Sequence, residues 1–232
     1  MLTIRAANER GHANYGWLDA YHTFSFADYF DSAHMGFGPL RVINEDWVAP
    51  GKGFAMHGHR DMEVVTYIIE GSVEHKDNTG QATVIGPETV QRMSAGTGIR
   101  HSEYNPSTEQ TLHLLQIWIE PAQEGLTPNY EYQQFSTPDR QSKLQIIASP
   151  DGVFNSLTIH QDVVIMAAKL AQGEQISHVL QGGRKAWLQM VQGSVVVNGL
   201  TVHVGDGVAI SDEEKVEIAA QEEAEFLLFD LA

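Results

Sequence analysis

Residues 51–63 read GKGFAMHGHRDME, and the two histidines of this stretch, His57 and His59, are separated by a single residue. In a β-strand, residues i and i+2 point to the same face, so both imidazoles are expected to project into the interior of a β-barrel. The stretch therefore predicts a β-strand that presents two metal-binding side chains to an interior site.

A second stretch, GTGIRHSEYN at residues 96–105, carries His101 and Glu103 at the same spacing. It follows the first pair by about 40 residues, as expected where a barrel brings two distant strands together. A lone His-x-His pair arises by chance in about half of chains with this histidine content, so the second pair carries much of the weight. Together, His57, His59, His101 and Glu103 predict one divalent metal per chain, with two coordination positions open to reactants.

The remainder of the chain also has the pattern of an all-β protein. Short β-branched and aromatic runs are interrupted by Gly, Pro, Asn or Asp at intervals of roughly eight to twelve residues. We expect strands at 40–44, 63–70, 71–75, 82–85, 89–93, 112–120, 156–161, 163–170, 186–191, 194–197, 208–210 and 225–231, with turns at 77–80 and 198–199. Helices are expected to be few and short.

An internal repeat divides the chain. Residues 65–73 (VTYIIEGSV) match residues 187–195 (WLQMVQGSV) in pattern, and the polar, proline-containing residues 121–142 between them favour a linker. We therefore expect two β-barrel domains of jelly-roll type, residues 1–134 with the metal and residues 135–232 without it. In the second half His160, His178 and His203 form no His-x-His or His-x-Glu pair.

Composition excludes several classes of function. The 232 residues are 42% hydrophobic and 19% charged, which is typical of a globular protein with a packed core. A formal net charge of −16 argues against nucleic acid or an anionic membrane as partner. The absence of cysteine excludes disulfides and thiolate ligands. Because no signal peptide or membrane-spanning segment is recognisable, we expect a cytoplasmic protein.

Other residues near these motifs have more ordinary interpretations. Glu63 is expected to hydrogen-bond a metal ligand rather than to bind the metal. His113 is expected to line the barrel, and a role in a pocket stays open. We expect His12, His34 and His75 at the surface. The expectation for the N-terminal arm is that it packs onto the barrel through His22, Phe24, Phe26, Tyr29 and Phe30.

These motifs resemble those of the cupin superfamily. The first cupin motif is Gly, five residues, His-x-His, three or four residues, Glu, six residues and Gly. Its members here are Gly51, His57, His59 and Glu63, followed by Gly71 after a gap one residue longer. The second cupin motif is matched by Gly98, His101 and Asn105, whereas Gly96 replaces its proline.

In detail the chain resembles the pirin family of bicupins. The stretches that carry this resemblance are residues 14–18, 22–29, 41–44, 61–63 and 94–103. The resemblance is specific over residues 1–120. Beyond the linker it rests only on the pattern of short strands and turns that is typical of a β-barrel. In pirins the metal-binding glutamate lies two residues after the third histidine, which corresponds to Glu103.

The resemblance implies a function. Some pirins are described as quercetin 2,3-dioxygenases, which open the heterocyclic ring of a flavonol with O2 and release carbon monoxide. It implies Fe(II) as the usual metal, while nickel, cobalt, manganese or zinc also suit these ligands. Glu103 is then both a ligand and a candidate catalytic base for a small phenolic substrate.

Two alternatives remain open. Eukaryotic pirins are described as redox-responsive nuclear cofactors of transcription, so the chain could be a non-catalytic metal or redox sensor that binds a protein partner. A different small-molecule cupin enzyme, such as an isomerase, would need no O2. Turnover of quercetin distinguishes an enzyme from a sensor, and an anaerobic assay distinguishes the two enzymes.

Overall fold

The computed structural model describes all residues from 1 to 232 and consists almost entirely of β-strands, which confirms the all-β expectation. Its helical segments are α1 (Thr137–Arg140) and the 3-10 turns η1 (Ala7–Glu9) and η2 (Val153–Asn155). The expectation of few, short helices is therefore also confirmed. None of them has the length and apolar character needed to cross a membrane.

The chain divides into two compact units, which we describe separately. The N-terminal unit comprises residues 11–134 and 157–161, and the C-terminal unit comprises residues 1–10, 135–156 and 162–232. The division differs from a single boundary after residue 134 in two short segments: residues 1–10 group with the C-terminal unit, and residues 157–161 group with the N-terminal unit. The first ten residues leave the N-terminal unit because β1 (Leu2–Arg5) pairs with β20 (Gly207–Ile210) along its whole length.

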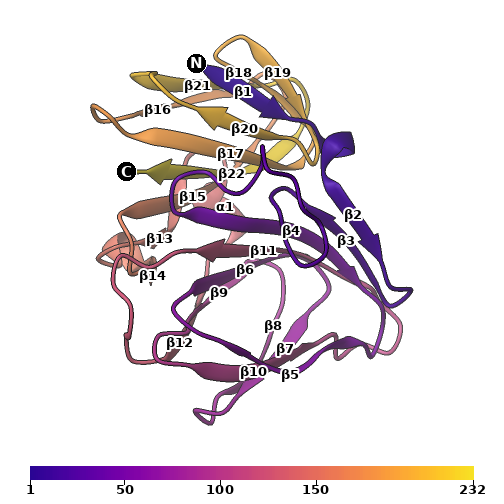
Figure 1. Cartoon of the computed structure of the whole chain (residues 1–232). Coiled ribbons are helices and arrows are strands. Elements are labelled where there is room, and N and C mark those ends of the chain that lie inside the picture. The colour runs from indigo at the N-terminus through magenta and orange to yellow at the C-terminus, as the bar shows by residue number, and fades with distance from the viewer. The chain divides into compact units, whose positions relative to one another are not determined.

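The N-terminal unit is built from two antiparallel sheets (Figure 1). The larger sheet has the order β12 (Asn129–Gln134), β9 (Thr89–Ser94), β6 (Glu63–Glu70), β11 (Leu112–Ile119), β4 (Leu40–Val48), β3 (Leu18–His22) and β2 (Gly11–Asn14). The smaller sheet has the order β5 (Gly53–His59), β10 (Ile99–Tyr104), β7 (Val73–Asp77) and β8 (Ala82–Ile85). Val48 and Leu114 of the larger sheet share a core with Val73 of the smaller one, as in a jelly roll.

The C-terminal unit repeats this two-sheet plan. Its larger sheet contains, in order, β1, β20, β17 (Lys185–Gln192), β22 (Ala224–Leu231), β15 (Val163–Leu170) and β13 (Gln145–Ser149). Its smaller sheet contains β16 (Gln175–Val179), β21 (Lys215–Ala220), β18 (Ser194–Val197) and β19 (Leu200–His203). Leu188 and Phe226 of the larger sheet pack with Val195 of the smaller one.

The sequence repeat corresponds to the same turn in both units. Gly71 separates β6 from β7, and Gly193 separates β17 from β18. Both have positive φ, 79° and 71°, and a Cβ on either glycine would overlap a backbone carbonyl oxygen, that of Thr111 or of Glu223. Only glycine fits such a position without strain, so the turn between corresponding strands retains the same residue.

The segment expected to be a linker contains regular secondary structure. Residues 121–142 contain β12 and α1, and the division between the two units after Gln134 falls within this segment. β12 is polar because it is the edge strand of its sheet and most of its residues are partly or fully exposed. The strand expected at 156–161 is reduced to the two-residue β14 (Leu157–Thr158).

Candidate metal centre

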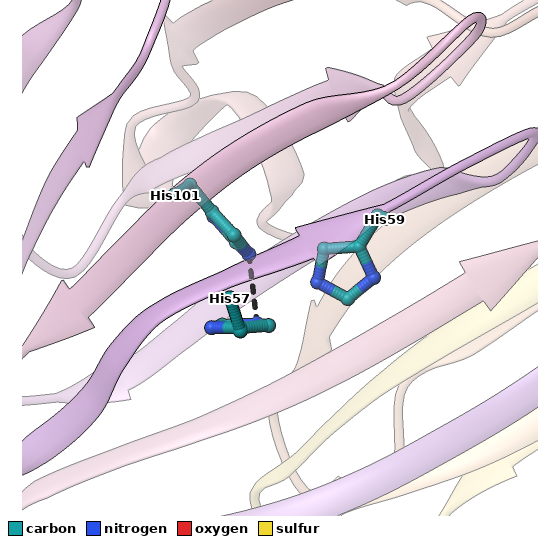
Figure 2. A group of neighbouring side chains, drawn as sticks. All are labelled: His57, His59 and His101. Atoms are coloured by element: carbon teal, nitrogen blue, oxygen red, sulfur yellow. Dashed lines mark hydrogen bonds between the residues drawn. The ribbon is translucent and has the colours of Figure 1, made fainter.

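Three histidines converge on the smaller sheet of the N-terminal unit. β5 and β10 are antiparallel neighbours, and their register pairs His57 with His101 and His59 with Ile99. Figure 2 shows the three imidazoles of His57, His59 and His101 pointing toward one another from these two strands. One ring nitrogen from each lies within 4.8 Å of the others. The pairing of two distant strands therefore produces a compact group of nitrogen donors.

Hydrogen bonds and burial make these nitrogens available to a cation. His57 Nδ1 lies 2.8 Å from the carbonyl oxygen of Ala55, so Nδ1 donates and Nε2 keeps its lone pair. Burial and, secondly, the neighbouring His57 lower the pKa of His59 to about 4 and that of His101 to about 2. Both rings are therefore neutral near pH 7.

The closest approach in this group is between His57 Nε2 and His101 Nε2, 3.1 Å apart (Figure 2). Two lone pairs at this separation repel unless a proton or a cation lies near both. A set of imidazole nitrogens without any cysteine suits a divalent first-row metal, so the residues present fit such an ion.

Glu103 lies beside His101 in a buried, hydrogen-bonded position. It forms a second group of potential ligands with His75 and His101, whose atoms also lie within 4.8 Å of one another. β10 keeps a regular register with β7 from His101 to Tyr104, so His101 and Glu103 project from the same face of β10. The ladder to β5 is irregular there, because two steps along β10 correspond to three steps along β5, from Phe54 to His57. The structure thus places Glu103 next to one of the three histidines, and not within the three-histidine group itself.

Two glutamines hold the Glu103 carboxylate. Gln91 Nε2 donates to Oε1 at 2.5 Å and Gln116 Nε2 donates to Oε2 at 2.9 Å. Burial raises the pKa of Glu103 to about 7, although the hydrogen bonds from these glutamines and Thr66 oppose the shift. The carboxyl group is therefore able to exchange a proton near neutral pH.

Sequence reasoning missed both glutamines and misplaced His75. Gln116 was detectable in principle, because it continues the inward phase of Leu112 and Leu114 on β11 and is followed by a cavity-lining Trp118. His75, expected at the surface, is fully buried. Its ring stacks on Tyr130 at a centroid distance of 4.1 Å and bonds to Asp77, which satisfies it in the interior.

Two further expectations about single residues are wrong. His113 lies on the face of β11 opposite to the inward residues, where it stacks on Trp47 at 4.1 Å and bonds Glu45 Oε1 at 3.0 Å. Glu63 is buried but bonds Ser94 Oγ at 3.0 Å and His160 Nδ1 at 3.3 Å, instead of a candidate ligand. His113 alternates with Leu112 and Leu114, so it points away from the core that they face. The partners of Glu63 are set by the tertiary fold, which brings Ser94 and His160 to it.

The other histidines and aromatic residues are mostly where expected. His12 and His34 are at least partly exposed, and each bonds an aspartate. Phe24 is buried, whereas Phe30 is 74% exposed and does not pack onto the barrel. His160 belongs to the N-terminal unit because its segment returns there.

The histidines open onto a mainly apolar cavity of ≈ 380 Å³. His57 and His59 line it, and the rings of Trp118 and His59 are perpendicular, with their centroids 4.9 Å apart. The remaining lining residues are Tyr15, Trp17, Leu18, Ala20, His22, Phe26, Ala27, Asn44, Asp46, Phe54 and Gln116. Size and lining suit a small, largely aromatic ligand.

The histidines of the C-terminal unit, His178 and His203, belong to neither group of potential metal ligands. His178 Nε2 bonds Asp230 Oδ2 at 2.6 Å, and Arg184 also donates to Asp230. His203 is exposed on β19. Both groups of three potential metal ligands lie in the N-terminal unit.

Two jelly-roll units in one all-β chain, one of them with a histidine cluster between neighbouring strands, define a bicupin. Comparison with known families agrees: the family described as Pirin matches residues 3–119, and the quercetinase C-terminal cupin domain matches residues 146–231. The chain belongs to the pirin family.

Its relatives include a curated enzyme and a metal complex. Quercetin 2,3-dioxygenase of Escherichia coli K12 is 49% identical, over 100% of this chain and 99% of the relative. The Caulobacter vibrioides pirin-like protein is 41% identical, over 100% of both chains. The crystal structure of the bacterial pirin YhhW from Escherichia coli in complex with nickel(II) superimposes with a TM-score of 0.96, is 49% identical, and covers 100% of this chain and 99% of its own. The expectation of a pirin-type bicupin is confirmed, and a site for one divalent metal is supported.

Proposed function

We propose that this protein is a metal-dependent dioxygenase that opens the heterocyclic ring of a flavonol such as quercetin with O2 and releases carbon monoxide. The observation that carries the proposal is a cluster of three histidines, two of which, His57 and His59, line an aromatic cavity of ≈ 380 Å³. A planar phenolic substrate matches the apolar lining, and relatives at 49% identity bear the name of this activity.

We assign the metal ligands as His57, His59, His101 and Glu103. The first three supply nitrogen donors from two neighbouring strands, and Glu103 is the nearest buried carboxylate to His101 that belongs to a ligand group. Fe(II) is our proposed metal in the cell, while nickel, cobalt, manganese and zinc suit the same donors. When bound, the metal supplies Lewis acidity that lowers the pKa of a coordinated hydroxyl group.

The protein contributes orientation, an apolar cavity and a proton acceptor. The aromatic side chains of Trp17, Phe54 and Trp118 favour a flat ring system next to His57 and His59. A carboxylate oxygen of Glu103 accepts the proton of the substrate hydroxyl. Gln91 and Gln116 keep that carboxylate in place by donating to its two oxygens.

We also propose that residues 1–134 and 135–232 act as two domains and that only the first binds metal. Support comes from the location of both ligand groups in the N-terminal unit and from the pairing of His178 with Asp230. Elemental analysis of the full chain then gives one metal ion, and His57→Ala removes it. Two ions per chain, or an unchanged content in His57→Ala, would contradict this assignment.

Turnover tests the function directly. The full chain is loaded in turn with Fe(II), Ni(II), Co(II) or Mn(II), and quercetin is followed by loss of its visible absorbance together with O2 uptake. We expect equal consumption of flavonol and O2, no reaction without O2, and no reaction in His57→Ala. His34→Ala, which removes a partly exposed histidine far from the ligand set in sequence, is the matched control. If no metal supports consumption of flavonol, the dioxygenase proposal is wrong and a sensor becomes the better hypothesis.

A further inference from the structure

Asp46 lies in the cavity wall with a buried, unpaired carboxyl group. It belongs to β4, is 3% exposed, and lines the same cavity as His57 and His59. Its Oδ1 atom has no hydrogen-bond partner. Buried polar atoms in folded proteins are nearly always paired, so an orphaned oxygen in a cavity wall indicates a group that a ligand satisfies.

The neighbouring strands offer Asp46 no partner. Directly across the sheet lie Ala20 on β3 and Leu114 on β11, whose side chains cannot hydrogen-bond. On the same face of β4, Val48 is apolar, and Asn44 Oδ1 is already bonded to His22 Nδ1 at 2.8 Å. The open direction for the carboxyl group is therefore the cavity.

The state of this carboxyl group suits a hydroxyl ligand. Burial and, secondly, the nearby carboxylates of Glu103 and Glu45 raise the pKa of Asp46 to about 8. A carboxyl group accepts a hydrogen bond in either protonation state and also donates one when protonated, the form that a raised pKa favours. A phenolic hydroxyl group has the same two capacities, whereas an inorganic anion would accept only.

We propose that Asp46 binds a hydroxyl group of the phenolic substrate, other than the hydroxyl group at the metal, and so selects among flavonols by their hydroxylation pattern. This inference rests on the proposed function, because it takes a flavonol as the ligand of the cavity. It adds a polar anchor to a mainly apolar cavity, and Asp46 is the one lining residue whose buried oxygen has no hydrogen-bond partner. Sites that pair with a substrate hydroxyl reject analogues that lack it, since the protein group is then left buried and unpaired.

Equilibrium binding tests the assignment without turnover. The nickel-loaded full chain is titrated under nitrogen with quercetin and with a set of flavonols that each lack one hydroxyl group but keep the 3-hydroxyl. Quenching of tryptophan fluorescence reports binding, because Trp17 and Trp118 line the cavity. The variants are Asp46→Leu, which removes hydrogen bonding, and Asp46→Asn, which retains a donor and an acceptor. Glu45→Gln is the control, since Glu45 bonds His113 on the opposite face of the sheet.

We expect the wild type to bind quercetin about 10-fold more tightly than one member of the set, and Asp46→Leu to reduce that ratio to about 2-fold or less. Asp46→Asn and Glu45→Gln should retain most of the preference. If Asp46→Leu weakens every flavonol by the same factor, or none of them, Asp46 does not recognise a hydroxyl group. If the wild type still turns over quercetin, such a result in Asp46→Leu overturns this inference and leaves the proposed function standing. Failure of the wild type to bind any flavonol overturns it together with the proposed function.

A stability measurement shows whether the Leu variant is folded and gives a second readout. Replacing an unpaired buried carboxyl group by an apolar side chain of similar size should raise the melting temperature of the unliganded protein. A higher melting temperature with loss of hydroxyl selectivity is the combined result expected for a binding residue. If the melting temperature falls in Asp46→Leu and also in Asp46→Asn, the carboxyl group is structural and the inference is wrong.

Discussion

His75 and His101 face each other through their Nδ1 atoms, which are 3.5 Å apart, and His75 Nε2 lies 3.0 Å from Asp77 Oδ2. The three side chains form a chain that runs from the histidine cluster into the smaller sheet. Asp77 is itself fixed, because its Oδ1 accepts from the Thr79 and Gln81 backbones. A carboxylate at the end of such a chain favours the tautomer of His101 whose Nε2 lone pair faces the cluster.

We therefore predict that Asp77→Asn and His75→Ala weaken nickel binding roughly 10- to 100-fold, although neither residue is among the assigned ligands. Competition with a chromophoric chelator measures the dissociation constant. His12→Ala is the matched control, because His12 also pairs with an aspartate, Asp19 at 2.6 Å, but on the surface. Equal affinities in Asp77→Asn and wild type would show that the chain does not orient His101.

Replacement of Glu103 separates ligation from proton transfer. In Glu103→Gln the side chain keeps an oxygen donor, so we expect metal to be retained while turnover falls roughly 10²- to 10⁴-fold. Gln91 and Gln116 donate to the two oxygens of the native carboxylate. In Glu103→Gln one of these oxygens becomes an NH2 group, so one of the two glutamines loses its acceptor. Metal content and rate are measured on the same preparation.

Glu63→Gln provides the matched control for that experiment. Glu63 is an equally buried glutamate of the same unit, but its partners are Ser94 and His160. We expect its rate to stay near that of the wild type. Near-normal turnover in Glu103→Gln would assign the base to another group.

The repeated turn predicts a large effect of a single methyl group. Gly193→Ala should destabilise the protein by more than about 1 kcal/mol, because the new Cβ overlaps the Glu223 carbonyl oxygen in addition to the cost of positive φ. Gly173→Ala has a similar φ, 83°, with open space around the Cβ, so it measures the conformational cost alone. Urea unfolding of both variants gives the difference. Equal losses would remove steric contact as the reason for the glycine.

The Asp230 pair predicts a pH-dependent contribution to stability. Burial acts to raise the pKa of Asp230, but hydrogen bonds from His178 and Arg184 outweigh it and leave the pKa below its ordinary value. A lowered folded-state pKa stabilises the folded state above the ordinary aspartate value of about 4, and the stabilisation disappears as the pH falls through the lowered pKa.

Asp230→Asn should therefore lower the free energy of unfolding by about 1–3 kcal/mol at pH 7, and by less at pH 3. Urea titrations at the two pH values measure the difference. Glu214→Gln, an exposed acid in the same unit, should have little effect at either pH. A loss that is the same at pH 3 would show that the charge of Asp230 is not its source.

Much of the architecture follows from local sequence pattern. Runs of β-branched and aromatic residues between turn residues predict the strands. The turn glycines Gly71 and Gly193 mark the repeat, because positive φ is a property of a single residue. The His-x-His spacing places His57 and His59 on one face of a strand for the same reason. These features need no knowledge of the partner strand.

The surroundings of the cluster depend on tertiary structure. Glu103 is held by glutamines from β9 and β11, and His75 is buried only because Tyr130 of β12 covers its ring. The isolation of Asp46 is likewise visible only when Ala20 and Leu114 are seen on either side of it. Strand pairing between segments distant in the chain creates these contacts, and a bulge such as that in β5 between Phe54 and His57 changes the register of two strands in a way that a sequence pattern does not reveal.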